Sequence, residues 1–211
     1  MRWIAGSMMF AAVSAAGAQT PAVTQPVTKP VTYPAPERQI AAAVTPLPEP
    51  LRAGAQVLGY DASGKLVTLR PGTNEMICLS DNPANPRFHV SCYHKSLDAF
   101  MARGRELRLQ KMTEDMVDST RAREIRAKTL SMPAQPAALH QYFASRDSVD
   151  AATGTIRGAR YLYVVYTPYA TYQTTGISEK PVDGGPWIMF PGTPFAHLMI
   201  SPQKPATVET K

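Results

Sequence analysis

Short runs of alternating apolar and polar residues predict a β-rich region in the middle of the chain. A four-residue turn that ends in Gly64 separates the first two runs, as in a β-hairpin. An asparagine- and proline-rich loop separates the next two runs. The four predicted strands lie at 55–60, 65–70, 75–80 and 88–94. We expect them to form a small antiparallel meander.

The pattern changes after residue 95, where apolar residues recur at the spacing of a helix. Ser96 is placed to cap a first helix, and Thr113 is placed to cap a second. Acidic residues follow Thr113 and basic residues lie near residue 126, which is the charge order that a helix dipole favours. The apolar face of the first helix comprises Leu97, Phe100, Met101, Gly104 and Leu107.

The C-terminal part of the chain alternates between polar loops and apolar runs. Residues 140–158 are polar and contain glycine, so we expect a loop there. Residues 169–186 form a second loop, and loops of this length are usually functional or disordered. Three further strands are predicted at 161–166, 186–190 and 195–200, the first of them rich in aromatic and β-branched residues.

These elements predict a single α+β domain at residues 51–202. We expect an antiparallel sheet with one or two helices packed on one face, together with one disulfide. The polar residues 203–211 are expected to form a frayed tail.

The N-terminus has the pattern of an exported protein. Arg2 precedes a short apolar run, and Ala16-Gly17-Ala18 fits a signal-peptidase site, so residues 1–18 are predicted to be a signal peptide. An uncleaved anchor is the alternative, although a membrane span needs about 20 apolar residues. Residues 19–50 are rich in proline and are predicted to form a disordered tether. We therefore expect a secreted or periplasmic location, with no transmembrane segment after cleavage.

The two cysteines, Cys78 and Cys92, are predicted to form a disulfide, because exported proteins retain disulfides. The loop that this bond closes contributes about 3 kcal/mol in the loop-entropy model. His89, Cys92 and His94 also have a metal-like spacing. Strand alternation places His89 on the opposite face from the other two, so we predict no metal site there. We predict no cofactor.

Two histidines are the candidate catalytic residues. His197 shares one face of its predicted strand with Phe195 and Met199, where a histidine is either a packed core residue or an acid–base group. If the last strand lies near the fourth, His94 and His197 would converge. A carboxylate such as Asp183 would then complete a catalytic site.

Tyrosines gather in one stretch of the chain and predict a binding surface. Five of the nine lie there, and tyrosine-rich strands suit sugars or peptides as ligands. The alternative is that they simply fill a β-strand and its rim. The candidate binding residues are Tyr161, Tyr163, Tyr166, Tyr169 and Tyr172, with Trp187 beside them.

The charge is mildly basic, with 22 Lys and Arg against 16 Asp and Glu. This balance favours anionic surfaces or partners without specifying one. In residues 103–128 the two signs are interspersed, which is typical of a solvated helix face. We expect no nucleic-acid partner.

Several short motifs resemble one group of proteins. The string Gly72-Thr73-Asn74, the two cysteines, Pro186-Trp187 and the pattern H-x-M-I at 197–200 resemble secreted bacterial proteins of uncharacterised function. The resemblance covers roughly residues 55–200. It implies export and a shared domain, and it draws attention to His197 and to Asn74, which we add to the candidate binding residues.

The leading hypothesis is an exported, non-enzymatic binding or structural module of the bacterial periplasm or cell envelope. Its candidate partners are a cell-envelope polymer, a peptide or a small ligand. The alternative is a small secreted hydrolase or metal-dependent enzyme that uses His94 or His197. The sequence leaves open whether the chain is an enzyme.

Overall fold

Three long antiparallel strands form the centre of the fold. They are β4 (Arg87–His94), β5 (Ala137–Ser145) and β6 (Ile156–Tyr166), which pair side by side in continuous register. The structure is a computed structural model, and it describes residues 31–150, 155–182, 184–202 and 206–208, the last of these as backbone.

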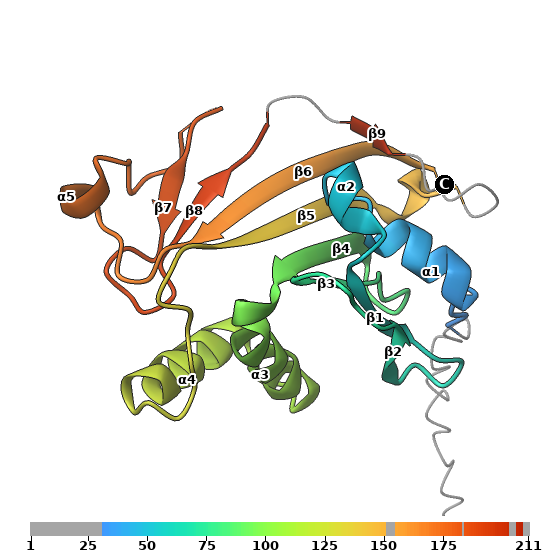
Figure 1. Cartoon of the computed structure of the whole chain (residues 1–211), viewed down its shortest axis with the longest axis horizontal. Helices are drawn as coiled ribbons and strands as arrows, with labels where there is room; N and C mark the ends of the chain where they lie inside the picture. The colour runs from blue at the N-terminus through green and yellow to red at the C-terminus, as the bar shows by residue number, and fades with distance from the viewer. Residues whose placement is uncertain (1–30, 151–154, 183, 203–205, 209–211) are drawn as a thin grey trace, which may run out of the picture. The chain divides into compact units, whose positions relative to one another are not determined.

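Five shorter strands extend this centre into one mixed sheet of order β2-β1-β3-β4-β5-β6-β8-β7 (Figure 1). They are β1 (Gln56–Tyr60), β2 (Leu66–Arg70), β3 (Met76–Leu79), β7 (Trp187–Met189) and β8 (His197–Ile200). A further strand, β9 (Ala206–Val208), pairs with the first half of β6. The predicted α+β class is confirmed. The tail prediction is wrong for residues 206–208, while residues 203–205 and 209–211 lie outside the described part.

The predicted β-hairpin is confirmed, but the meander continues differently. β1 and β2 are antiparallel, whereas β3 pairs with the other side of β1 in parallel. The chain crosses the start of β1 at Gly72, where a Cβ atom would lie only 2.8 Å from the backbone nitrogen of Gln56. The glycine therefore permits the close crossing that brings β3 beside β1.

The prediction of a loop at residues 140–158 is wrong. Residues up to Ser145 belong to β5, and β6 already begins at Ile156. The polar residues His140 and Gln141 are compatible with a strand here because they lie in parts of the sheet that are only half-buried. A short 3₁₀ turn (Arg146–Ser148) joins the two strands on the β5 side.

Helices cover both faces of the sheet, where the sequence predicted them on one. Face A carries Tyr93, Leu139 and Val164 and packs against α3 (Asp98–Leu109) and α4 (Glu114–Arg126). Face B carries Cys78, Cys92 and their neighbours and packs against α1 (Pro36–Ala43). Figure 1 shows the two groups of helices on different sides of the strands.

The N-terminal segment from residue 31 is part of this fold, so the tether prediction is wrong for residues 31–50. Pro36 occupies the first turn of α1, where a missing N–H costs nothing, so the proline favours the helix start. Ala43 and Leu47 are buried against face B. A second short helix, α2 (Glu49–Arg52), leads into β1. The predicted signal peptide and residues 19–30 lie outside the described residues.

The side chain of Gln39 fastens α1 to the sheet. Its Nε2 donates to the carbonyl oxygens of Tyr60 (2.7 Å) and Pro34 (2.8 Å). Its Oε1 accepts from the backbone N–H of Tyr60 at 2.8 Å and from the Ser80 hydroxyl at 2.9 Å. Because Gln39 is buried, losing any of these partners would leave a polar group unpaired.

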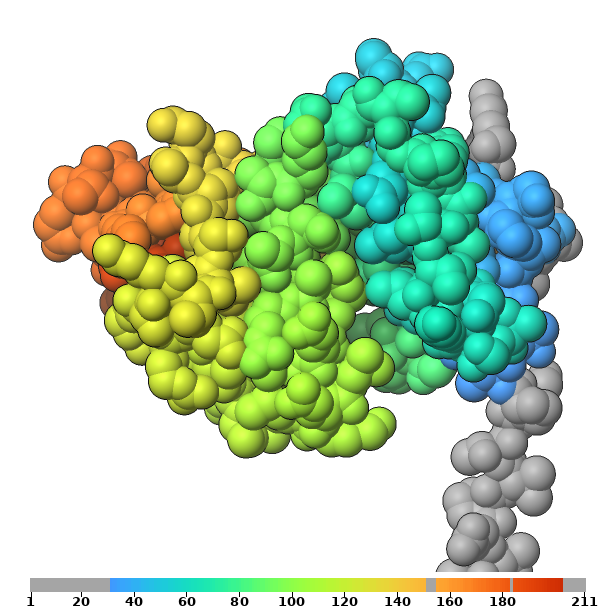
Figure 2. All heavy atoms as spheres, turned by 60° about the horizontal axis from the view of Figure 1, so that its bottom comes forward, coloured from blue at the N-terminus to red at the C-terminus, as the bar shows by residue number. Residues whose placement is uncertain are grey.

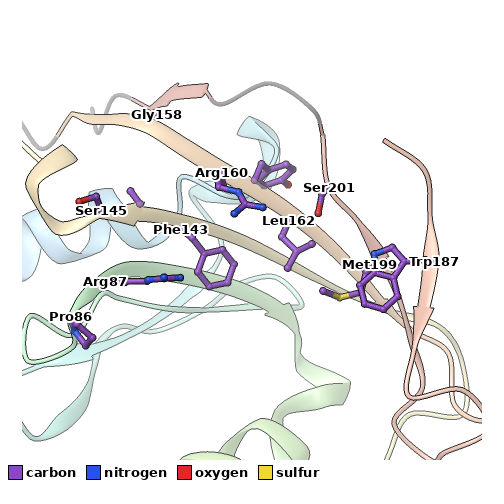
Figure 3. A pocket seen from close by; sticks show the side chains of 12 residues that line it. Pro86, Arg87, Phe143, Ser145, Gly158, Arg160, Leu162, Trp187, Met199 and Ser201 are labelled. Atoms are coloured by element: carbon purple, nitrogen blue, oxygen red, sulfur yellow. The ribbon is translucent and has the colours of Figure 1, made fainter. Parts of the chain in front are cut away.

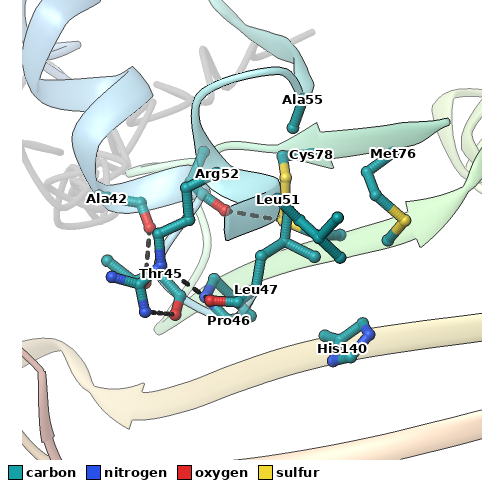
Figure 4. Close-up of a disulfide and its surroundings, with 12 residues drawn as sticks. Ala42, Thr45, Pro46, Leu47, Leu51, Arg52, Ala55, Met76, Cys78 and His140 are labelled. Carbon is teal, nitrogen blue, oxygen red and sulfur yellow. Dashed lines mark hydrogen bonds between the residues drawn. A yellow bond between two sulfur atoms is a disulfide. The ribbon is translucent and has the colours of Figure 1, made fainter. Parts of the chain in front are cut away.

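The Cys78–Cys92 disulfide is present and links β3 to β4. The two cysteines are directly opposed across the strands, with their Cα atoms 4.0 Å apart. The bond lies under the N-terminal segment, beside Leu47 (Figure 4). The Sγ of Cys92 lies 3.1 Å from the carbonyl oxygen of Ala43, a close contact in which the sulfur carries no proton to donate. The disulfide thus connects the sheet with its N-terminal cover.

The helical pair α3–α4 forms a layer of its own over one half of face A, visible as the yellow-green surface in Figure 2. Thr113 caps α4 as predicted, accepting from the backbone N–H of Met116. The guanidinium of Arg103 pairs with Glu124 at 2.7 Å across the two helices. Among the described residues, no helix has the length and apolar character needed to cross a membrane.

Removing the disulfide should destabilise the oxidised protein. We expect a Cys78→Ala/Cys92→Ala variant to lose about 3 kcal/mol, which lowers the melting temperature by roughly 6–12 °C for a domain of this size. Differential scanning calorimetry with and without reductant measures the shift. A variant with the same melting temperature as the oxidised wild-type protein would contradict a stabilising disulfide.

Truncating the N-terminal cover should also destabilise the domain. Leu47 is 1% exposed, so Leu47→Ala should cost about 2–5 kcal/mol in urea unfolding. Val31→Ala is the matched control, because Val31 is 46% exposed and should change stability by less than about 0.5 kcal/mol. Equal, small effects of the two substitutions would mean that residues 31–50 are only a tether.

Candidate ligand-binding groove

The structure does not bring His94 and His197 together. His94 ends β4 on face B, beside Cys92 in the alternation of that strand. His197 lies on face A, opposite Tyr166. The two strands are separated by β5 and β6, a lateral distance of about 14 Å at 4.8 Å per strand. Opposite faces and this separation prevent the two imidazoles from acting on one substrate.

Each of the two imidazoles has a structural partner. The Nδ1 of His94 lies 2.8 Å from the Ser96 hydroxyl and accepts from the Ser96 backbone N–H, so His94 caps the 3₁₀ turn Lys95–Leu97. The Nδ1 of His197 lies 2.9 Å from the carbonyl oxygen of Phe195 and therefore carries the proton. Burial lowers the pKa of His197 by desolvation of its charged form.

Asn74, which the resemblance also singled out, forms a turn. Its side-chain amide donates to the carbonyl oxygen of Leu51 at 2.8 Å, and its Oδ1 accepts from the N–H of Met76 at 2.9 Å. The N–H groups of Thr73 and Asn74 both donate to the carbonyl oxygen of Gly54. The Gly-Thr-Asn string thus joins the start of β3 to the segment before β1. Asp183, the candidate carboxylate, lies outside the described residues.

The five candidate tyrosines do not share one surface. Tyr161 and Tyr163 point to face B and pack against each other with ring centroids 4.1 Å apart. Tyr161 donates to the carbonyl oxygen of Pro46 and accepts from Nδ1 of His140, each at 2.8 Å. These bonds hold the N-terminal segment on the sheet, and Tyr163 is 37% exposed beside them.

The remaining three tyrosines lie elsewhere. Tyr166 is buried on face A, where its ring contacts those of Phe100 and His197. Tyr169 and Tyr172 are exposed on the segment that follows β6. That segment was predicted to be a loop and contains one short helix, α5 (Tyr172–Thr175).

An open groove lies on face A beyond the helical pair (Figure 3). Its volume is about 870 Å³. Register explains its position, because α3 and α4 cover the row of Tyr93 where it crosses β4, β5 and β6. The β8–β7 end of that row, Met199 and Trp187, and the rows toward the start of β4 line the groove. Side chains of five strands line it, including Arg87, Phe143, Arg160, Leu162, Met199 and Trp187.

The floor of the groove is apolar and continuous with the core. Leu162 and Met199 are half-buried and pack against the core cluster beneath the helical pair. The ring of Phe143 stacks on that of His89, with 4.4 Å between centroids and 3° between planes. His89 is itself held by Gln141, at 2.8 Å from Nε2 to Oε1. A rigid apolar floor of this kind suits ligand binding.

Two arginines give one end of the groove a positive charge. Arg160 lies directly opposite Phe143, and Arg87 lies one row further along β4, so the two guanidiniums flank Phe143 and Ser145. Both arginines are exposed, and no carboxylate of the residues that the structure describes lines the groove. Among the described residues, neither has an ion-pair partner.

A β-bulge shapes the wall beside Arg160. The pairing of β6 with β9 shifts register between Ile156 and Ala159, and Gly158 has a φ of +62° with open space around its Cα. A glycine in the left-handed backbone conformation bends the strand at this point. The bulge lets β6 change partner from β8 to β9, and Gly158 borders the groove where the partners change.

Sequence reasoning named two residues of the groove lining, Trp187 and Tyr161, although the ring of Tyr161 points to face B, and it missed most of the others. Trp187 was a candidate because it stands beside the tyrosines, and it does face the groove, opposite Met199. Arg87 and Arg160 are single residues far apart in the chain, and Phe143 lay in a predicted loop. A correct prediction of β5 as a strand would have been needed to find them, since its register brings Arg87, Phe143 and Arg160 together.

Within residues 31–150, 155–182 and 184–202, no group of three or more His, Cys, Asp or Glu side chains is placed to hold a metal ion. Comparison with protein-family models, with curated proteins and with solved structures finds no match to this chain.

Three histidines that are buried or half-buried should make the protein less stable in mild acid. Burial lowers the pKa values of His89, His140 and His197 below their usual 6.5. As the pH falls below about 6.5, the unfolded chain takes up protons that the folded chain resists, so the free energy of unfolding decreases. Urea unfolding at pH 7.5, 6.5 and 5.5 measures the trend. A free energy that stays constant or rises toward pH 5.5 would contradict the burial of these imidazoles.

Proposed function

We propose that the chain is an exported binding module of the bacterial periplasm or cell envelope, and that the groove on face A is its ligand site. The observation that carries the proposal is the open hollow of about 870 Å³ with a half-buried apolar floor. Leu162, Met199 and Trp187 remain partly exposed there although α3 and α4 cover Tyr93, Leu139 and Val164 beside them. Exposed apolar concavities of this kind mark binding sites more often than inert surface.

Export is supported by two independent features. The N-terminal pattern of Arg2, an apolar run and Ala16-Gly17-Ala18 is that of a signal peptide. The disulfide between Cys78 and Cys92 belongs to a compartment in which such bonds persist. A periplasmic or extracellular ligand is therefore the appropriate class to test.

The positions of the polar side chains favour binding over catalysis in this groove. A catalytic site requires a nucleophile, a base and an orienting group within hydrogen-bonding reach of one another. His89 lies on face A beside the groove without lining it, and its ring is restricted because it stacks on Phe143 and bonds to Gln141. The serines at the edge, Ser145 and Ser201, are exposed, and within the described part of the chain neither forms a hydrogen bond with an imidazole. The groove thus offers shape and apolar area for a ligand.

The groove should bind a neutral apolar probe. In a Trp3→Phe background Trp187 is the remaining tryptophan, so its emission reports on the groove alone. We expect N-phenyl-1-naphthylamine to quench Trp187 with saturation. Leu162→Asp should weaken binding about tenfold or more, because it removes about 1.5 kcal/mol or more of apolar contact.

Leu109→Asp is the matched control, since Leu109 lies on α3 and is 81% exposed. Calorimetry of both variants separates lost binding from lost folding. A probe that binds the Leu162→Asp and wild-type proteins equally, or that leaves Trp187 unchanged, would show that the groove is not the site.

A further inference from the structure

We infer that the ligand of this groove is a single-chain anionic amphiphile, a fatty-acid-like molecule whose carboxylate lies between Arg87 and Arg160 and whose apolar chain extends over Leu162 and Met199 to Trp187. This inference rests on the proposed function and specifies its ligand class. It follows from the positive charge at one end of the groove and from the apolar side chains that line the rest of it.

The arginines point to an oxyanion as the head group. They lie on face A at either side of β5, two strand spacings apart and one row apart along the strands, which places their Cα atoms about 12 Å from each other. Their long side chains both extend toward Phe143 (Figure 3). Two guanidiniums without a carboxylate partner in the described chain repel each other, and an anion between them relieves that repulsion.

A carboxylate suits this pair for geometric reasons. Guanidinium groups present N–H donors in a planar fork that matches the two oxygens of a carboxylate. The hydroxyl groups of Ser145 and Ser201 lie on the groove lining as further donors. Arginine stays charged at any physiological pH, so the head-group site does not depend on titration of the protein.

The rest of the lining points to an apolar body without amide groups. The backbone of β5 and β6 is paired in register from Ala137 to Phe143, so the face of the sheet presents side chains and no free N–H or C=O groups there. A peptide lying across this face would leave its own amides without partners, which is costly. Leu162, Met199 and Trp187 offer apolar contact only, apart from the indole N–H.

The distances also fit a chain rather than a compact molecule. Arg87 lies on β4 and Trp187 on β7, with β5, β6 and β8 between them. Four strand spacings amount to about 19 Å across the sheet, and Trp187 also lies three rows, about 20 Å, from Arg87 along the strand direction. The groove is thus an elongated path across five strands with its charge at one end and an aromatic side chain at the other (Figure 3).

The test is a titration of the full-length Trp3→Phe protein with dodecanoate, 1-dodecanol and dodecylammonium, each below its micelle concentration, read by Trp187 emission. We expect dodecanoate to bind about tenfold more tightly than the alcohol, and the ammonium to bind most weakly. Octanoate and decanoate should bind progressively more weakly than dodecanoate, by up to about fourfold per methylene.

Arg87→Gln/Arg160→Gln should remove the preference for dodecanoate over dodecanol while leaving the affinity for dodecanol unchanged. Arg126→Gln is the charge control, because Arg126 is exposed at the end of α4 and does not line the groove. Both substitutions replace exposed side chains, so melting temperatures should stay close to that of the parent protein.

The outcomes separate the two proposals. If dodecanoate and dodecanol bind equally and the double arginine variant behaves like its parent, the groove is a site but its ligand is not anionic. If a leucine-rich peptide or a vesicle of anionic phospholipid binds while dodecanoate does not, the fatty-acid inference is overturned. If no amphiphile or neutral probe changes Trp187 emission, the proposed function itself fails.

Discussion

The continuous register of β4, β5 and β6 is the constraint on which the rest of the structure depends. Side chains alternate between the two faces of a strand, so pairing Tyr93 with Leu139 and Leu139 with Val164 fixes the face of every residue in the three strands. A shift of one residue in β5 would place Phe143 on face B and His140 on face A. The disulfide, the packing of α1 on face B and the groove on face A all require the observed register.

The two faces have different roles because different segments cover them. On face B, the N-terminal segment is joined to the sheet by Gln39, by the Tyr161–Pro46 hydrogen bond and by burial over the disulfide. On face A, the helical pair covers the residues near the end of β4 and the start of β3, and leaves the start of β4 and the β8–β7 edge open. Partial cover of one face therefore creates the groove, and the bulge at Gly158 shapes one of its walls.

Local signals were enough to predict the hairpin, the helices α3 and α4 and the disulfide, since each depends on nearby residues. The turn before Gly64, the cap at Thr113 and the even number of cysteines are such signals. β5 was missed because its polar residues lie at half-buried positions, which only tertiary structure reveals. The N-terminal cover was missed because its prolines resemble those of a tether, although Pro36 begins a helix.

The candidate site could be predicted only in part for the same reason. Trp187 was recognised as an aromatic side chain near other aromatic residues. Arg87 and Arg160 lie 73 residues apart and meet only through the pairing of β5 with both neighbours. His94 and His197 attracted attention as catalytic residue types, and register placed them on opposite faces. Strand order and register, rather than residue type, decide which side chains act together.

The most direct test of the account compares the two faces of one strand. Met199 lies on face A and Ile200 on face B of β8. Methyl NMR spectra during a dodecanoate titration should show large, saturable shifts for Met199 and Leu162 and little change for Ile200. Equal shifts at Met199 and Ile200, or shifts confined to Ile200, would contradict a ligand site in the groove on face A.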